Sequence, residues 1–175
     1  MGIREKTLVV FTTDNGAKGG SSTLFGREID GKKGDLTEGG SRVPLIVNWP
    51  GTTPAGVVKK DLVVLADMLP TFVELGGGKP AEGITIDGQS FAPQIRGENG
   101  KPRDWIYMHL HTKYYIRDPR WKLTSKGEFF DMREAPFEEI PIPRDTPDSE
   151  AKAAPARARL QKELNTLRSS AKPES

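Results

Sequence analysis

Asp14 and Asn15 are the first residues along the chain whose types and position suggest a chemical role. They supply a carboxylate and an amide carbonyl, which are hard oxygen ligands of the kind that Ca²⁺ and Mg²⁺ prefer. Gly16 follows them, and Asp-Asn-Gly is equally a common turn sequence, because all three residue types favour turns. These residues alone therefore leave a cation site and a plain turn both open.

An apolar run precedes this pair and predicts how it is positioned. Residues 8–11, Leu-Val-Val-Phe, are β-branched, aromatic or leucine and predict a buried strand over residues 7–12. A continuous apolar strand is typical of a parallel sheet covered on both faces. Ligands of open α/β sheets bind beyond the carboxyl ends of the strands, which is where Asp14 and Asn15 stand.

Further motifs along the chain resemble those of the sulfatase family. After Asp-Asn-Gly come Lys-Gly at residues 33–34, Glu-Gly-Gly-Ser-Arg-Val-Pro at residues 38–44 and Leu-Ile-Val-Asn-Trp-Pro-Gly at residues 45–51. The match continues with Asp-Met-Leu-Pro-Thr at 67–71, Asp-Gly-Gln-Ser at 87–90, Trp-Lys-Leu at 121–123 and Phe-Asp-Met at 130–132. Because the motifs follow the family's order, the resemblance is specific. It also argues against a related phosphoric-ester hydrolase.

The resemblance implies an α/β fold that covers only the C-terminal portion of a sulfatase. Residues 1–100 would form the C-terminal part of the core, a mostly parallel sheet with flanking helices. Residues 101–168 would form a small antiparallel sheet followed by a terminal helix, and residues 169–175 a disordered tail.

The resemblance also implies a chemistry. Sulfatases cleave sulfate esters with a formylglycine nucleophile while a divalent cation, usually Ca²⁺, holds the sulfate oxygens. Asp14 would be a metal ligand able to accept a proton from the nucleophile, and Asn15 would supply a second ligand. Lys33, which directly precedes Gly34, would contact the sulfate and stabilise the leaving oxygen as a catalytic residue, with Lys32 as the fallback.

Several family features have no counterpart in this sequence. There is no cysteine and no Ser-x-Pro-x-Arg motif from which formylglycine could be made, and the family's N-terminal acidic pair is absent. Two oxygen ligands fall short of the roughly six to eight that Ca²⁺ takes. We therefore expect the chain by itself to bind Ca²⁺ weakly and not to turn over sulfate esters.

Two functional readings follow. In the first, the chain is a truncated sulfatase whose site accepts a sulfated small molecule or glycan once a missing N-terminal half completes it. In the second, it is a non-catalytic remnant that acts as a binding or interaction module. Loss of the flanking strands would leave an apolar sheet edge exposed, so we expect poor stability or self-association.

Two further pairs of polar residues are candidates for a structural or a functional role. Glu38 and Arg42 flank a glycine-rich loop, and we expect them to pair with each other or with backbone groups and to hold that loop. His109 and His111 are the two histidines of the chain, and on a strand they would face the same side. Without a third ligand nearby they are read as surface residues, with metal binding or substrate contact as the alternatives.

Composition excludes several classes of protein. The net charge is +2 and no basic stripe carries interleaved aromatic residues, so we expect no nucleic-acid partner. No apolar run could span a bilayer, so we expect no membrane association through a spanning helix. Residues 1–7 are too short and too charged for a signal peptide. The lack of cysteine leaves the compartment undetermined.

Local patterns predict the remaining elements. Asp67 would cap a helix that the glycines at residues 76–78 end, and residues 17–28 would form a glycine- and serine-rich loop. Strands are expected over residues 44–48, 62–65, 105–110, 113–116, 121–124 and 128–131, and a helix over residues 151–168. In that last helix Leu160, Leu164 and Leu167 fall on one face.

Overall fold

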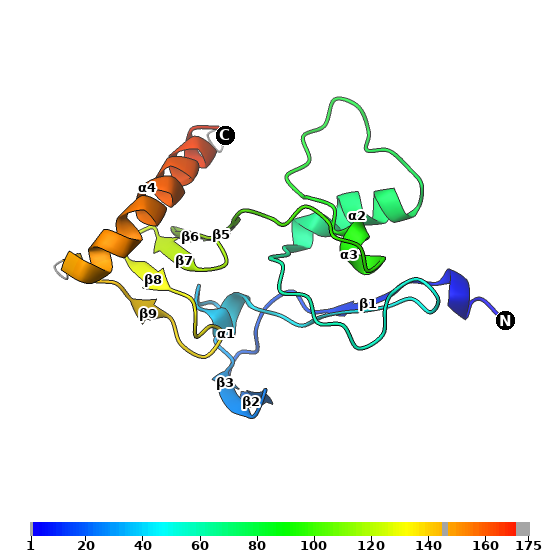
Figure 1. Cartoon of the computed structure of the whole chain (residues 1–175), viewed down its shortest axis with the longest axis horizontal. Helices are drawn as coiled ribbons and strands as arrows, with labels where there is room; N and C mark the ends of the chain where they lie inside the picture. Colours follow the sequence, from blue (N-terminus) through cyan, green and yellow to red (C-terminus); the bar gives the residue numbers. More distant parts are fainter. Residues whose placement is uncertain (1, 145–146, 171–175) are drawn as a thin grey trace. The chain divides into compact units, whose positions relative to one another are not determined.

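The computed structural model describes residues 2–144 and 147–170 of the 175-residue chain. Four α-helices, two short 3₁₀ helices and nine strands are described (Figure 1). In chain order they are η1 (Arg4–Lys6), β1 (Val9–Thr12), β2 (Ser21–Leu24), β3 (Arg27–Asp30), α1 (Glu38–Ser41), β4 (Leu45–Asn48), η2 (Leu65–Asp67), α2 (Met68–Leu75), α3 (Ala92–Ile95), β5 (Ile106–Leu110), β6 (Lys113–Arg117), β7 (Trp121–Thr124), β8 (Phe129–Asp131), β9 (Ile140–Pro141) and α4 (Pro147–Ser170).

The chain divides into two compact units. We call residues 1–14 and 43–104 the strand–helix unit, and residues 15–42 and 105–175 the sheet unit. From sequence, residues 15–42 are expected in the first domain. In the structure they group with the C-terminal sheet, because their side-chain contacts are made with β6, β7 and residues 134–139.

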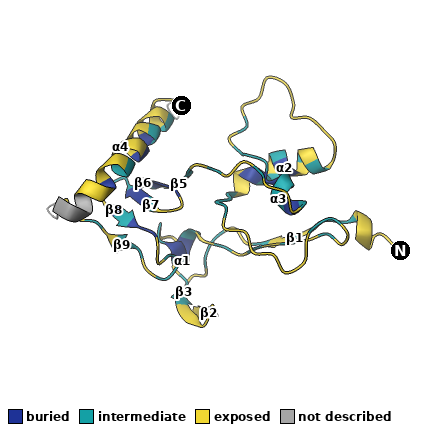
Figure 2. Ribbon diagram, in the orientation of Figure 1, coloured by how far each residue is buried: buried dark blue, intermediate teal, exposed yellow. Residues whose placement is uncertain are grey.

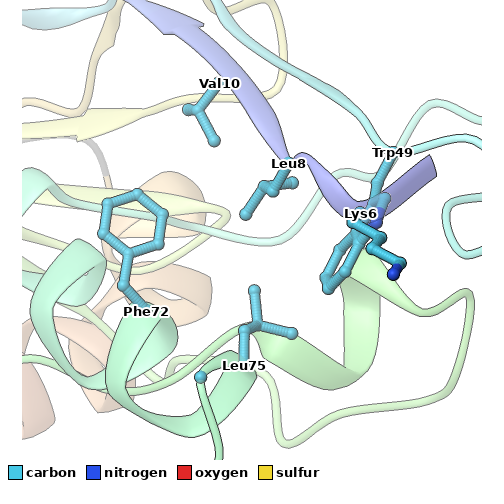
Figure 3. Close-up of a pocket in the computed structure, with 7 residues that line it drawn as sticks. Lys6, Leu8, Val10, Trp49, Phe72 and Leu75 are labelled. Atoms are coloured by element: carbon cyan, nitrogen blue, oxygen red, sulfur yellow. The ribbon is translucent and has the colours of Figure 1, made fainter. Parts of the chain in front are cut away.

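The strand–helix unit contains a two-stranded ladder next to α2. β1 and β4 pair antiparallel, with Val10 opposite Val47. Val10 and the preceding Leu8 point toward Phe72 and Leu75 of α2, and together with Trp49 and Lys6 they surround an open hollow of about 490 Å³ (Figure 3). The inward face of this ladder is therefore apolar, as a strand rich in Val and Leu requires.

The first strand differs from its prediction in two respects. Within the described residues its only partner is β4, which runs antiparallel, so the parallel neighbours expected for it are not found in that part of the chain. It is also not buried on both faces, since Val9, Phe11 and Ile46 on the outward face are 46%, 57% and 59% exposed. The physical reason is that β1 and β4 form a ladder of only two strands among the described residues, and α2 lines one face of it through Phe72 and Leu75.

The predicted strand over residues 62–65 is wrong. Val64 has extended backbone angles, but residues 62–64 pair with no strand of the described part of the chain, and η2 begins at Leu65, where the Val64 N–H donates to the Asp67 carboxylate at 2.9 Å. Asp67 is 2% exposed and also accepts the Gln89 N–H at 2.7 Å and an ion pair from Arg103. Asp67 stands at the start of α2 as predicted, but its side chain makes no capping bond to that helix.

The sheet unit is built on a five-stranded antiparallel sheet in the order β5-β6-β7-β8-β9. This is the predicted C-terminal meander, and the α/β class of the whole chain is also confirmed. Its core is formed by one face of the sheet and by α4, which contacts β6 and β7 (Figures 1 and 2). The fully buried members of this core are Ile116, Leu123, Phe129, Ala153, Leu160 and Leu164.

The terminal helix is longer than predicted. It spans Pro147–Ser170, and Leu160 and Leu164 are buried while Leu167 packs beside them, as their spacing predicts. Residues 169 and 170, expected to be disordered, continue α4, and residues 171–175 of the expected tail lie outside the described residues. None of the helices in the described part of the chain is long and apolar enough to cross a bilayer.

Residues 17–28, predicted as a loop, instead contain most of a β-hairpin. β2 and β3 pair antiparallel, with Leu24 opposite Arg27. The connecting residues Phe25 and Gly26 have φ values of 50° and 77°, as tight two-residue hairpin turns require. The prediction failed because Phe-Gly is not a usual turn pair and the strands carry polar side chains.

Candidate functional site

Asp14 and Asn15 lie just beyond the end of β1. Asp14 is exposed, and Asn15, the first residue of the sheet unit, is partly buried. The Asn15 Nδ2 group donates to the carbonyl oxygen of Gly16 at 3.1 Å, so the side-chain amide is held close to the backbone that follows it. Both residues are therefore at the strand end, where the sequence predicted them.

Lys33 is positioned by the backbone that follows the β2–β3 hairpin. The Lys33 N–H donates to the carbonyl of Ala17 at 2.9 Å, and the Lys32 N–H donates to the carbonyl of Gly39 at 3.0 Å. Both lysine side chains are exposed. The segment that begins with Asn15 thus runs beside the one that carries Lys33.

Glycines allow these segments to approach so closely. The Gly16 N–H donates to the Gly40 carbonyl at 2.9 Å, and a Cβ placed on Gly16 would overlap the carbonyl oxygen of Gly39. A Cβ on Gly39 would overlap the carbonyl of Asp30, and one on Gly40 that of Asp35. The glycines of Asp-Asn-Gly and of Glu-Gly-Gly are therefore required by backbone packing, in addition to any turn that they form.

Glu38 is the most connected side chain of this region. It is 5% exposed, and one carboxylate oxygen accepts from Arg42 at 2.6 Å, which is the pairing expected from sequence. The other oxygen forms an ion pair with Arg117 of β6, which is also 5% exposed. The carboxylate thus has a guanidinium on each oxygen, as a buried charge requires.

A second buried charge pair lies next to Glu38. Lys122 of β7 is 2% exposed, and its ammonium group lies 2.7 Å from the Glu139 carboxylate and donates to the Leu36 carbonyl at 2.7 Å. Glu139 in turn accepts the backbone N–H of Glu38 at 3.0 Å. Tyr115 adds a hydrogen bond of 3.1 Å between its hydroxyl and that of Ser41. Burial raises the pKa of Tyr115 to about 12.

These contacts from the C-terminal sheet were missed from sequence. Neither Arg117 nor Lys122 was among the predicted site residues, and Lys122 was placed only within the Trp-Lys-Leu motif of an expected strand. The available signal was the position of two charged residues within or next to otherwise apolar strand runs. Charged residues are almost never fully buried unless paired, so each predicts a buried partner.

The two histidines do not share a strand face. His109 lies on β5, packed 6.0 Å from Tyr114 and 6.1 Å from Tyr107 between ring centroids. His111 lies in the tight turn between β5 and β6 and has a φ of 55°. The expectation of a common face is wrong, because the chain reverses one residue after β5 ends. In the part of the chain that the structure describes, no group of three or more His, Cys, Asp or Glu side chains could hold a metal ion.

Comparison with known proteins identifies the family. A family model described as N-sulphoglucosamine sulphohydrolase, C-terminal, matches residues 32–170. Human arylsulfatase D is 35% identical over 138 residues, covering 75% of this chain and 23% of that protein. Mouse steryl-sulfatase is 33% identical over 150 residues, covering 78% of this chain and 23% of that protein. The chain belongs to the sulfatase family and corresponds to its C-terminal portion.

Solved structures agree in fold. The crystal structure of Ps i-CgsB superposes with a TM-score of 0.71 at 26% identity, covering 94% of this chain and 37% of that one. BT4656, solved in complex with its substrate D-glucosamine-2-N,6-O-disulfate, superposes with a TM-score of 0.69 at 22% identity and covers 94% and 34%. The chain therefore spans well under half the length of these relatives.

Proposed function

We propose that this chain supplies part of the cation and sulfate-ester site of a sulfuric ester hydrolase. Asp14 and Asn15 would be ligands of a Ca²⁺ ion, and Lys33 would contact a sulfate oxygen. The observation that carries the proposal is the backbone bonding around α1, which joins the Asn15 segment to the Lys33 segment through Gly16, Gly39 and Gly40. Membership of the sulfatase family supports a role for this arrangement in binding a cation and a sulfate ester.

The donor set fits a hard divalent cation but is incomplete. A carboxylate and an amide carbonyl are suitable ligands for Ca²⁺, whereas the ion takes about six to eight oxygens. When bound, such an ion would act as a Lewis acid toward the sulfate oxygens. The sequence has no cysteine and no Ser-x-Pro-x-Arg motif that could become formylglycine, so we expect binding without turnover.

Lys33 would act as a point charge. Its ammonium group sits on a flexible stem, its side chain is exposed, and its backbone is fixed by the bond to Ala17. Because water screens an exposed charge, we expect the contact between this lysine and a sulfate oxygen to contribute about 1 kcal/mol, as exposed ion pairs do. In hydrolysis the same charge would stabilise the oxygen that leaves the sulfur.

The substrate class that we propose is a sulfated sugar or a sulfated small molecule. BT4656 binds a disulfated glucosamine, and the mouse relative is a steryl-sulfatase, so both classes occur among the similar proteins. Which of the two this site accepts depends on residues that the rest of a full-length sulfatase would contribute.

The test is a Ca²⁺ titration of the purified chain, followed by NMR at the Asn15 side-chain amide, beside an assay with a chromogenic sulfate ester. We expect weak binding, with a dissociation constant of about 1 mM or above, and no turnover. Turnover above that of buffer would contradict the predicted inactivity, and an Asn15 amide that does not respond to Ca²⁺ would contradict the proposed ligand role.

A second candidate role is association with a second copy of the chain. Val9, Phe11 and Ile46 form an exposed apolar face on the β1–β4 ladder, which we call the outward face. Contiguous exposed apolar side chains on a sheet are typical of an association surface. This role requires no catalysis, and sedimentation at increasing protein concentration tests it.

A further inference from the structure

The immediate neighbours of the proposed site residues Asn15 and Lys33 are bonded, through the backbone, to α1. Gly16 donates to Gly40, and Lys32 donates to Gly39, so the residues next to Asn15 and Lys33 are bonded to this short helix, in addition to the bond from the Lys33 N–H to Ala17. α1 has four residues, of which two are glycine. A single turn with two glycines cannot hold its own conformation in water, because helix nucleation is unfavourable and glycine disfavours helix. The position of α1 must therefore be fixed by contacts with other parts of the fold.

The start of α1 is fixed by two buried charges of the C-terminal sheet. Arg117 pairs with the Glu38 carboxylate, and both residues are buried. The Lys122 ammonium group donates to the Leu36 carbonyl at 2.7 Å, two residues before the helix begins. Glu139, itself bound to Lys122, accepts the Glu38 N–H at 3.0 Å. An orphan N–H of the first turn is thereby satisfied.

The end of α1 is fixed by a third contact. The Ser41 hydroxyl lies 3.1 Å from the Tyr115 hydroxyl, and the Arg42 N–H donates to the Glu38 carbonyl at 2.8 Å. Adjacent strands of one sheet, β6 and β7, thus hold both ends of α1, and their own pairing sets the spacing between the anchors.

Buried ion pairs of this kind are a weak source of stability, because an apolar pair of the same volume often stabilises a fold as well or better. An apolar pair does not fix the relative orientation of its two side chains. A paired carboxylate and guanidinium do, because their hydrogen bonds form in only a few relative orientations. The choice of charges at Glu38 and Arg117 therefore points to a requirement for the orientation of α1.

From this geometry we infer that Arg117 and Lys122 are positioning residues, which act through α1 to position the proposed cation ligand Asn15 and the proposed sulfate contact Lys33. The inference rests on the proposed function. It means that the C-terminal antiparallel sheet orients the site through α1, although none of the proposed cation or sulfate contacts comes from that sheet. Neither residue is proposed to touch substrate or metal.

The test compares Arg117→Met with Arg120→Met in the full 175-residue chain. Arg120 is a matched control because it belongs to the same unit and also pairs with a buried carboxylate, that of Asp131, without contacting α1. The first measurement is hydrogen exchange at the amides of Gly16, Lys32 and Lys33, relative to amides of the β6–β7 ladder. For each amide we compare the exchange rate in the variant with the rate in wild type. In Arg117→Met we expect this ratio to be about tenfold larger for the three loop amides than for the ladder amides. In Arg120→Met we expect no such difference.

The second measurement is a titration with CaCl₂ and with sodium sulfate, followed at the Asn15 side-chain amide and the Lys33 ammonium group. We expect both midpoints to rise several-fold in Arg117→Met, to return part of the way in Arg117→Lys, and to stay at wild-type values in Arg120→Met. A purely structural role would change the free energy of unfolding and leave these midpoints alone.

Loop amides that exchange no faster than the ladder amides in Arg117→Met, with unchanged midpoints, would overturn the inference. If Arg117→Met does not fold, the double variant Glu38→Gln with Arg117→Met removes both buried charges and is measured in the same way. If neither CaCl₂ nor sodium sulfate changes the signals of the Asn15 amide and the Lys33 ammonium group in wild type, the proposed function is contradicted. The exchange comparison then decides separately whether Arg117 holds the loop.

Discussion

Phe11 lies directly opposite Ile46 in the β1–β4 ladder, and more than half of each side chain is exposed to solvent. Together with Val9 these residues form the outward face, while the other face of the same ladder packs toward α2. A strand that is apolar on both faces is therefore covered on only one, and the uncovered side chains predict a measurable behaviour.

We expect the wild-type chain to associate with rising concentration and the double variant Phe11→Thr with Ile46→Thr to associate only at concentrations at least about tenfold higher. One large apolar side chain contributes about 1.5–3 kcal/mol when buried, and threonine keeps the preference for strand. Analytical ultracentrifugation measures the effect. Val58→Thr is the control, because Val58 is 76% exposed and lies outside the ladder. Equal association of all three proteins would refute the prediction.

Replacing Gly39 by alanine should destabilise the sheet unit by at least about 2 kcal/mol, because the new Cβ would overlap the backbone carbonyl of Asp30 and neither backbone can move freely. Urea unfolding followed by tryptophan fluorescence measures the change. Gly78→Ala, in the strand–helix unit, is the control for the change of residue type, since its Cβ would meet only ordinary contacts, with the closest atom at 3.4 Å. A Gly39→Ala chain as stable as Gly78→Ala would show that the loop can rearrange.

Neutralising Lys33 should weaken sulfate binding more than neutralising Lys32. Lys33→Gln and Lys32→Gln remove the same charge from neighbouring exposed positions, so the long-range field changes equally. We expect the midpoint of a sodium sulfate titration to rise at least about fivefold for Lys33→Gln, which corresponds to the loss of about 1 kcal/mol. It should change less than twofold for Lys32→Gln, an estimate of about 0.4 kcal/mol. The reverse order would assign the sulfate contact to Lys32.

Acid should destabilise the sheet unit through Asp131. Burial opposes ionisation of this carboxyl, but the hydrogen bonds from Arg133 and Arg120 outweigh it and lower the pKa of Asp131 below its ordinary value of 3.8. A carboxyl whose pKa is lower in the folded state stabilises the fold above its unfolded value and loses that contribution as pH falls through the folded value.

The measurement is urea unfolding of wild type and of Asp131→Asn between neutral pH and the acid limit. We expect the difference in unfolding free energy between the two proteins to be greatest above pH 4 or so and to shrink below the ordinary pKa of 3.8. Arg133→Met should reduce the same pH dependence, because it removes one of the two guanidinium partners. A difference that stays constant with pH would rule out Asp131 as its source.

Much of the fold could be predicted from sequence where the pattern was local. The meander from β5 to β8 followed from short β runs separated by turn residues, and the buried face of α4 followed from the spacing of Leu160 and Leu164. The pairing of Glu38 with Arg42 was also within reach, because the two residues are four apart and lie close in space. The β2–β3 hairpin was missed because its strands are polar and its turn is unusual.

What sequence could not supply was long-range pairing. An apolar strand predicts burial, but nothing in residues 8–11 specifies whether its neighbour is parallel or antiparallel, or how many faces are covered. Arg117 and Lys122 likewise give no local sign that their partners are Glu38 and Glu139. Such partners are chosen by the tertiary fold, which overrides strand and turn propensities.

The bond between Glu38 and Glu139 joins residues 101 positions apart, and the Glu38–Arg117 pair joins residues 79 apart. On the ribosome, Asn15 and Lys33 therefore leave the exit tunnel long before the anchors of α1 are synthesised. The contacts that hold α1 are therefore complete only once Glu139 has been synthesised, so the loop that carries Asn15 and Lys33 acquires its last anchor late in translation.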